Sequence, residues 1–261
     1  MSDLTRPIDP LYQPARSRSG GLRSRINSVL AGLLCFILLA APIALGSNRP
    51  LPWAIWAVVI GGATLFVVLA MSLSGERFRI GLRQVWPEAA LLCLLLVYLL
   101  LQQIPVGRFP IPNPSGLDLA APQISVAPGA TLLMFLRMLT YGLFGFLVLQ
   151  ASANGGRRNA ILDAVLLIVV LHAVYALLAL FQFDDTLLGA QKQDYLGSAT
   201  GTFVNRNSFA TFLAMGAGIA SAKLAATLVA RDRGRGTNII LYALALAILL
   251  VASISTNSRM G

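Results

Sequence analysis

The sequence has little charge and especially little acid. Charged residues make up 11% of the 261 residues, whereas a soluble domain contains roughly 25%. Hydrophobic residues make up 57%, so the polar side chains are too few to cover the surface of a soluble fold. The composition therefore excludes an ordinary soluble domain and predicts a membrane protein.

Residues that bind transition metals or form disulfides are also scarce. The only histidine is His172, and the cysteines Cys35 and Cys93 each lie inside an apolar run. No Cys/His cluster has metal-ligand spacing, so we expect no metal and no other cofactor. We expect both cysteines to be free thiols, because neither lies in a loop that faces an oxidising compartment.

The charge that is present is mostly basic, with 20 Lys and Arg against 10 Asp and Glu, a net charge of +10. In a soluble protein this excess suggests a nucleic-acid partner. Here most basic residues lie in short segments between long apolar runs, where they determine topology and contact lipid headgroups. We therefore expect membrane lipids as partners and no nucleic acid.

Seven apolar runs approach the length that crosses roughly 30 Å of hydrocarbon. They lie near residues 26–45, 53–73, 89–104, 131–149, 160–183, 208–230 and 239–254, and the third and seventh are the shortest. The predicted fold is an all-α, polytopic transmembrane helix bundle over residues 26–261, preceded by a basic tail at residues 1–25. We interpret the first run as an uncleaved span and not as a signal peptide.

Alternate crossing places thirteen basic residues on the side of the N-terminus and five on the other side, with Arg137 and Lys223 inside spans. Because basic residues accumulate in the cytoplasm, we expect a cytoplasmic N-terminus. The proline-rich segment 105–130 then lies outside as an extended, non-helical loop. The polar segment 184–205 forms a second outer loop.

The second outer loop turns into the sixth span between Gly201 and Ala210. A helix N-terminus has unsatisfied N–H groups and a positive dipole end, so this position suits an anion such as a diphosphate. Arg206 adds a full charge and a bidentate fork. The simpler interpretation is that Asn205 or Asn207 caps the helix and Arg206 anchors it at the interface. The residue types leave both interpretations open.

Two further arginines are candidates for the same anion. Arg259 follows the seventh span on the outer side, where it either joins Arg206 in holding a pyrophosphate or only flanks a helix end. Arg137 lies six residues inside the fourth run, where it either lines an outward cavity or snorkels to the surface. We expect Arg137, Arg206 and Arg259 to converge on one outward cavity, because a diphosphate requires concentrated positive charge.

The other polar residues within spans are given structural roles. A proton relay through His172 is conceivable, but we favour a histidine whose ring bonds a neighbouring hydroxyl or carbonyl. Asp163 and Lys223 are also interpreted as structural. A close helix-packing face is predicted in the sixth span from its small residues. These small residues are Gly216, Gly218, Ala220 and Ser221.

Two motifs resemble those of a known family. Gly201-Thr202-Phe203, followed by Asn205-Arg206-Asn207 and Ala210, resembles the Gly-x-Phe-x-Asn-x-Asn-x-x-Ala signature of the bacterial O-antigen ligase and O-antigen polymerase family. The ending Ser255-x-x-Ser258-Arg259-x-Gly261 is similar to the Ser/Thr-Ser-Arg-Gly element of that family, except that Met260 is inserted. Their order, and their separation by one helical hairpin, also fit the family.

The resemblance implies a glycosyltransferase of the bacterial inner membrane that works at the periplasmic face. Its donor is an undecaprenyl-diphosphate-linked glycan, and its acceptor is lipid A core in a ligase or a second lipid-linked glycan in a polymerase. The product is O-antigen of lipopolysaccharide, exopolysaccharide or capsule. By the same resemblance Arg206 and Arg259 contact the diphosphate without a metal, while Asn205 and Asn207 shape the cavity.

Family members have about a dozen spans and a large periplasmic loop that carries a histidine, which this sequence does not reach. We therefore expect the chain to be the N-terminal portion of a family member and to be inactive alone. Two alternatives remain open. One is a transporter with the same signature that moves inorganic carbon or another small anion, and the other is an inactive fragment.

Overall fold

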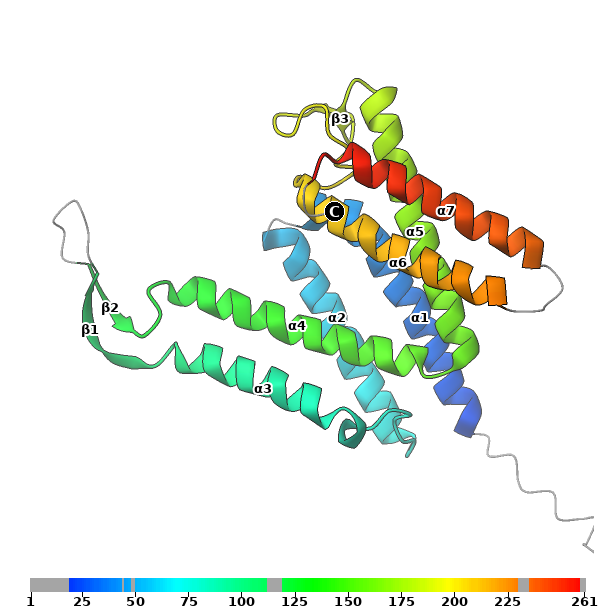
Figure 1. Ribbon diagram of the computed structural model, residues 1–261. Coiled ribbons are helices and arrows are strands. Elements are labelled where there is room, and N and C mark those ends of the chain that lie inside the picture. Colours follow the sequence, from blue (N-terminus) through cyan, green and yellow to red (C-terminus); the bar gives the residue numbers. More distant parts are fainter. Residues whose placement is uncertain (1–18, 44, 48–49, 112–118, 230–234, 259–261) are drawn as a thin grey trace, which may run out of the picture.

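The computed structural model describes residues 19–43, 45–47, 50–111, 119–229 and 235–258 (Figure 1). Six of its helices are long and apolar enough to cross a membrane, and a seventh apolar helix is shorter. The predicted all-α, multi-pass helix bundle is therefore confirmed. The shorter helix has 16 residues and spans about 24 Å at 1.5 Å per residue.

The helices and strands follow one another in a simple order. The first part contains α1 (Ser19–Ile43), η1 (Leu45–Ser47), α2 (Pro50–Leu73), η2 (Leu82–Gln84) and α3 (Trp86–Leu101). The strands β1 (Pro105–Ile111) and β2 (Leu119–Gln123) lead into α4 (Pro128–Ser152) and α5 (Gly155–Phe181). The last part contains β3 (Thr186–Leu187), β4 (Ala190–Gln191), α6 (Arg206–Val229) and α7 (Arg235–Ser255).

Helix boundaries follow the local sequence. Pro50 and Pro128 are the first residues of α2 and α4, where a missing N–H costs nothing. The side chain of Asn154 caps α5 by accepting a hydrogen bond from the backbone N of Arg157 at 3.2 Å. The chain reverses between α1 and α2 at Gly46, whose φ of 66° suits glycine.

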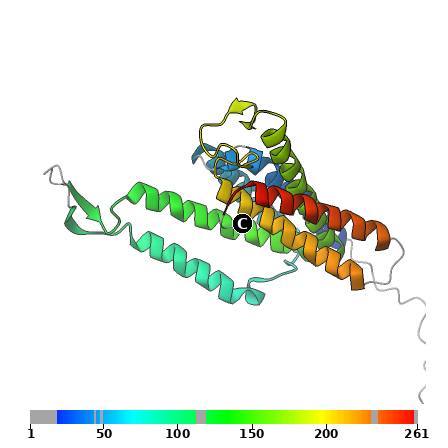
Figure 2. The same ribbon diagram turned by 45° about the horizontal axis from the view of Figure 1, so that its top comes forward.

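The proline-rich segment between α3 and α4 is extended, as its sequence predicts, but it is not an open loop. β1 and β2 pair antiparallel, with Pro105 opposite Gln123 and Ile111 opposite Leu119. Proline is tolerated because neither strand has a second neighbour within the described residues. The hairpin projects beyond the ends of α3 and α4, away from the other helices (Figures 1 and 2).

Helices α5, α6 and α7 pack closely, and α6 and α7 run side by side (Figure 2). A Cβ on Gly216 would lie 2.7 Å from Cγ1 of Val169 and 3.2 Å from Cδ1 of Leu249, so the predicted packing face is confirmed at this position. Ala220 is buried too. The prediction is wrong for Gly218 and Ser221, which are exposed because they lie on another side of α6.

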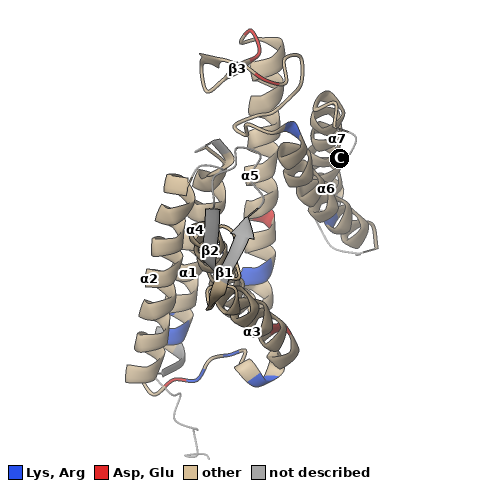
Figure 3. Cartoon of the chain, turned by 90° about the vertical axis from the view of Figure 1, so that its left-hand side faces the viewer, with Lys and Arg blue, Asp and Glu red and all other residues tan. Residues whose placement is uncertain are grey.

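Contacts between helix ends agree with alternate crossing. At one end Arg157 Nη2 donates to the carbonyl O of Ser24 at 3.3 Å, which joins the starts of α5 and α1. At the opposite end the backbone N of Ala199 donates to the carbonyl O of Ser255 at 2.7 Å, which joins the loop before α6 to the end of α7. Most of the helical length between these ends carries no charged residue (Figure 3).

Candidate functional site

The turn that leads into α6 is built by the glycine and the phenylalanine of the first motif. Gly201 has a φ of 57°, and a Cβ there would lie 2.9 Å from Cε2 of Phe209. The ring of Phe203 packs against Phe209 and Phe212, with centroids 5.5 and 5.3 Å apart. Glycine is therefore required for both its backbone angle and its close approach, and the aromatic cluster fixes the start of α6.

The asparagines of the motif have different roles. Asn205 lies just before α6, and its Oδ1 accepts a hydrogen bond from the backbone N of Asn207 at 2.7 Å. This is an N-cap contact, so the capping interpretation holds for Asn205. The Oδ1 of Asn207 instead accepts a hydrogen bond from Ser258 Oγ at 2.9 Å. Asn207 therefore connects the first motif to the second motif.

The second motif begins where α7 ends. Thr256 is fully buried, and its Oγ1 donates to the carbonyl O of Ser253 at 2.7 Å and accepts from the backbone N of Ser258 at 3.2 Å. Asn257 has a φ of 51°, a left-handed conformation that commonly ends helices. These contacts turn the chain toward the N-terminus of α6. Arg259, the expected diphosphate ligand, lies outside the described residues.

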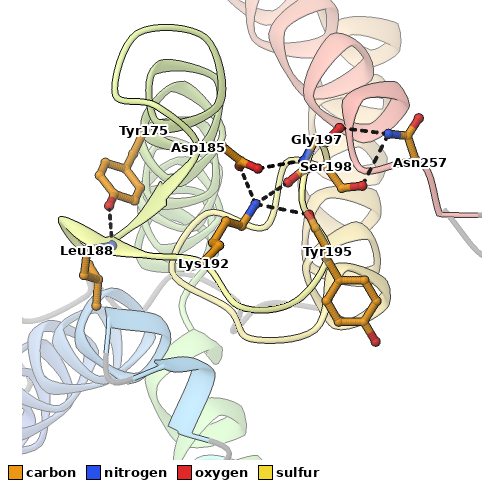
Figure 4. Close-up of polar contacts among 8 residues, drawn as sticks. All are labelled: Tyr175, Asp185, Leu188, Lys192, Tyr195, Gly197, Ser198 and Asn257. Atoms are coloured by element: carbon orange, nitrogen blue, oxygen red, sulfur yellow. Dashed lines mark hydrogen bonds and ion pairs between the residues drawn. The ribbon is translucent and has the colours of Figure 1, made fainter.

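A buried ion pair organises the loop between α5 and α6 (Figure 4). Lys192 Nζ lies 2.6 Å from Asp185 Oδ1 and donates to the carbonyl O of Ser198 at 2.6 Å. Asp185 Oδ2 accepts from the backbone N of Gly197 at 2.7 Å. The Lys192 side chain is only 4% exposed, so it requires this partner. The sequence showed these residues only as a polar loop, and no periodic pattern marks the pairing.

The loop also contacts both motifs. Asn257 Nδ2 donates to the carbonyl O of Gly197 at 3.1 Å and to Ser198 Oγ at 3.3 Å (Figure 4). Tyr195 places its ring under Arg206, whose Cζ lies 5.2 Å from the ring centroid. The Asp185–Lys192 pair thus holds the segment that positions Arg206 and Asn257.

Arg206 is half-buried at the first turn of α6. Its Nε is buried and has no hydrogen-bond partner among the described residues, and the same holds for Oγ1 of Thr202. A buried polar atom without a partner costs free energy unless a ligand or water satisfies it. The guanidinium therefore has donor capacity left at a helix N-terminus, where an anion is favoured.

Arg137 lies elsewhere. It lines a cavity of about 330 Å³ between α1, η1, α2 and α4, together with Trp53, Trp56 and Tyr141, and Arg206 is not among the lining residues. No contact joins Arg137 to Arg206 within the described part of the chain. The sequence-based convergence of Arg137, Arg206 and Arg259 thus stays a prediction, and the described contacts give it no support.

His172, Asp163 and Lys223, which lie within helices, have structural partners. Nδ1 of His172 lies 2.8 Å from the carbonyl O of Ile168, which confirms the expected carbonyl contact. Lys223 Nζ lies 2.8 Å from Asp163 Oδ1, and Tyr242 also donates to that oxygen at 3.2 Å. This cluster joins α5, α6 and α7, a pairing that their separation in the sequence concealed. Both cysteines are free, as predicted.

The site therefore combines a helix N-terminus, an arginine with an unpartnered Nε, and two motif segments joined by a hydrogen bond. No protein-family model, curated protein or solved structure matches the chain. A helix N-terminus and a guanidinium are groups that interact favourably with anions.

Proposed function

We propose that the chain carries the diphosphate-binding part of a bacterial inner-membrane glycosyltransferase. The enzyme transfers or polymerises an undecaprenyl-diphosphate-linked glycan at the periplasmic face, in the manner of O-antigen ligases and polymerases. Arg206 and Arg259 bind the diphosphate, while Asn205 and Asn207 shape the site. The acceptor is lipid A core or a second lipid-linked glycan.

The observation that carries the proposal is the hydrogen bond between Ser258 Oγ and Asn207 Oδ1. It joins two motifs that are 51 residues apart, and both resemble elements of the same enzyme family. A shared position is what a single substrate site requires. The unpartnered Nε of Arg206 beside this contact supports an anionic ligand.

The proposed transfer reaction assigns the arginines a role in stabilising the leaving diphosphate. During transfer an acceptor hydroxyl oxygen bonds to the anomeric carbon while the bond from that carbon to the diphosphate oxygen breaks. Negative charge accumulates on the departing diphosphate, so a fixed guanidinium stabilises the transition state more than the ground state. The apolar helices keep the polyprenyl chain in the bilayer.

Binding of radiolabelled undecaprenyl diphosphate to the purified protein tests the anion site directly. We expect Arg206→Ala to weaken binding about tenfold or more, the loss of one charge-assisted contact. Arg158→Ala is the matched control, because Arg158 is exposed at the start of α5. Equal affinity in wild type and Arg206→Ala would refute the proposed diphosphate site.

We infer that α1 begins in the cytoplasm and that the loop between α5 and α6 faces the periplasm. The asymmetry of the basic residues supports this orientation. The contacts between helix ends support only the placement of this loop at the end of the bundle opposite the start of α1. An alkaline phosphatase fused after Lys192 should be active, and one fused after Arg233 should be silent. The reverse pattern would overturn the orientation.

Transport of inorganic carbon or another small anion is the alternative function. A translocation path needs charged residues that face one continuous cavity. Arg137 and His172 line different cavities among the described residues, and the His172 ring is already engaged by a carbonyl. Glycan transfer is therefore the better supported proposal.

A further inference from the structure

Three adjoining cavities are lined by residues of α1, η1, α2 and α4, and Trp53 lines all of them. The first, of about 330 Å³, includes Trp56, Tyr141 and Arg137. The second, of about 620 Å³, is an almost entirely apolar groove between α2 and α4. The third, of about 170 Å³, again includes Arg137. The first and third cavities, both lined by Arg137 and Trp53, form a chamber that continues into the apolar groove.

Arg137 gives the chamber its charge. Among the described residues it is the only charged one that lines the three cavities, and its Cζ lies 4.9 Å from the centroid of the Trp53 ring. Within the described part of the chain the guanidinium has no other partner, acidic or neutral. An arginine inside a span is costly unless a counter-charge or water satisfies it. The chamber is therefore complementary to an anion.

The groove opens on the side of α2 that faces the surrounding lipid. Val58 and Leu51 line it and are 76% and 72% exposed, and in a membrane protein such side chains contact lipid. Gly61 also lines the groove, and a Cβ there would have no atom within 4 Å. A ligand that fills both the chamber at Arg137 and the apolar groove needs an anionic headgroup and an apolar chain. Such a ligand enters from the bilayer.

We infer that this chamber binds the phosphate headgroup of an anionic glycerophospholipid, with one acyl chain in the groove between α2 and α4. A single guanidinium, shared with a tryptophan face, matches the single charge of a phosphodiester. A lipid-linked diphosphate calls for more positive charge than the described lining residues supply. The site is separate from the one at Arg206 and does not depend on the proposed glycan transfer.

Native mass spectrometry of the purified chain, released from micelles that contain phosphatidylglycerol or zwitterionic phosphatidylcholine, tests the site. Wild type should retain phosphatidylglycerol over phosphatidylcholine, and Arg137→Gln should reduce that preference about tenfold, the loss of one charge-assisted contact. Arg206→Ala should leave lipid retention unchanged, which separates this site from the proposed diphosphate site.

A matched pair of glycine variants tests the groove. Gly61→Leu should fill it and reduce retention of the lipid several-fold, whereas Gly62→Leu should not, because Gly62 lines none of the three cavities. Both positions have open space for a side chain, so both variants should fold. Tryptophan fluorescence on heating checks that they do.

Three results would overturn the inference. One is an unchanged phosphatidylglycerol preference in Arg137→Gln. Another is equal lipid loss in Gly61→Leu and Gly62→Leu. The third is displacement of phosphatidylglycerol from wild type, but not from Arg137→Gln, by an equal concentration of undecaprenyl diphosphate. That last result would assign the chamber to the lipid-linked donor.

Discussion

Helix α5 and helix α3 differ in how much of their surface is buried against other helices. Helix α5 buries eight residues against α1, α6 and α7, among them Val169 and Ala173, which are fully buried. Helix α3 buries only Leu99, while Leu91 and Leu94 are 70% and 72% exposed. Among the described helices, the long helix that α3 packs against is α4. The α5–α7 unit is thus held by helix packing. Helix α3 instead forms an arm that lies along α4, whereas α4 itself also packs against α1, α2 and α5.

This difference in packing explains which part of the molecule can hold the side chains of a site in fixed positions. Both motifs lie at an end of the packed α5–α7 unit, where the Asp185–Lys192 pair and the Asn207–Ser258 contact fix the backbone. The arm instead leaves apolar surface exposed, which suits lipid or further helices. Closely packed helices hold reacting side chains in position more accurately than a helix with few contacts does. Function in the α5–α7 unit should therefore be sensitive to small changes that the arm tolerates.

The largest expected effect concerns the arginine that follows α7. The proposed function predicts that Arg259→Ala reduces glycan transfer about a hundredfold or more, because a leaving diphosphate would lose a fixed charge partner. Arg259→Lys should restore little, since an ammonium cannot reproduce a bidentate fork. A glycan-ladder assay on membranes with matched protein levels measures the loss.

Arg108 provides the matched control for this experiment. It lies in β1, beyond the arm, and it belongs to the same predicted outer side. Arg108→Ala should leave the ladder normal. A normal ladder from Arg259→Ala would show that Arg259 is only an interfacial anchor, and equal losses from both variants would remove the distinction between the two regions.

A smaller effect is expected from overpacking the α5–α7 unit. Gly216→Leu should destabilise the fold by about 2 kcal/mol, because its side chain would collide with Val169 and Leu249. Gly218→Leu is the control with the same change in helix propensity and open space around it. Unfolding by SDS in mixed micelles gives the free energy of unfolding of both variants. Equal destabilisation would contradict the conclusion that α6 packs at Gly216 but not at Gly218.

The sequence predicted the helices well because their signal is local. A run of apolar residues long enough to cross the bilayer needs no knowledge of its neighbours. Which face of a helix packs is a different matter. Gly216 and Gly218 look alike in the sequence, but only the former meets another helix. That distinction depends on the rotation of α6, which no short pattern specifies.

The candidate site was predictable only in part. A capping asparagine was one of the two interpretations that the position before an apolar run allowed, but the sequence did not decide between Asn205 and Asn207. The Asn207–Ser258 hydrogen bond and the Asp185–Lys192 pair did not follow from the sequence. The first depends on how the start of α6 meets the end of α7, and the second depends on how the loop between α5 and α6 folds back on itself. The convergence expected for Arg137 failed to find support for the same reason. Placement on one side of a membrane does not bring residues together across a bundle.

The smallest expected effect is that of the ion pair near the other end of the α5–α7 unit. Lys223 is largely buried, whereas Asp163 is about half exposed, with side-chain exposures of 17% and 47%. Polar contacts between membrane helices average about 0.6 kcal/mol, because the unfolded helices find other partners. A double-mutant cycle with Asp163→Asn and Lys223→Met should therefore give a coupling of about 0.5–1 kcal/mol. Tyr242→Phe removes only the hydroxyl that donates to Asp163 and should cost less than either change.

SDS unfolding measures all four members of the cycle. A coupling above about 2 kcal/mol, larger than the highest values found for such contacts, would mean that charge pairing, and not close packing at Gly216, distinguishes this unit from the arm.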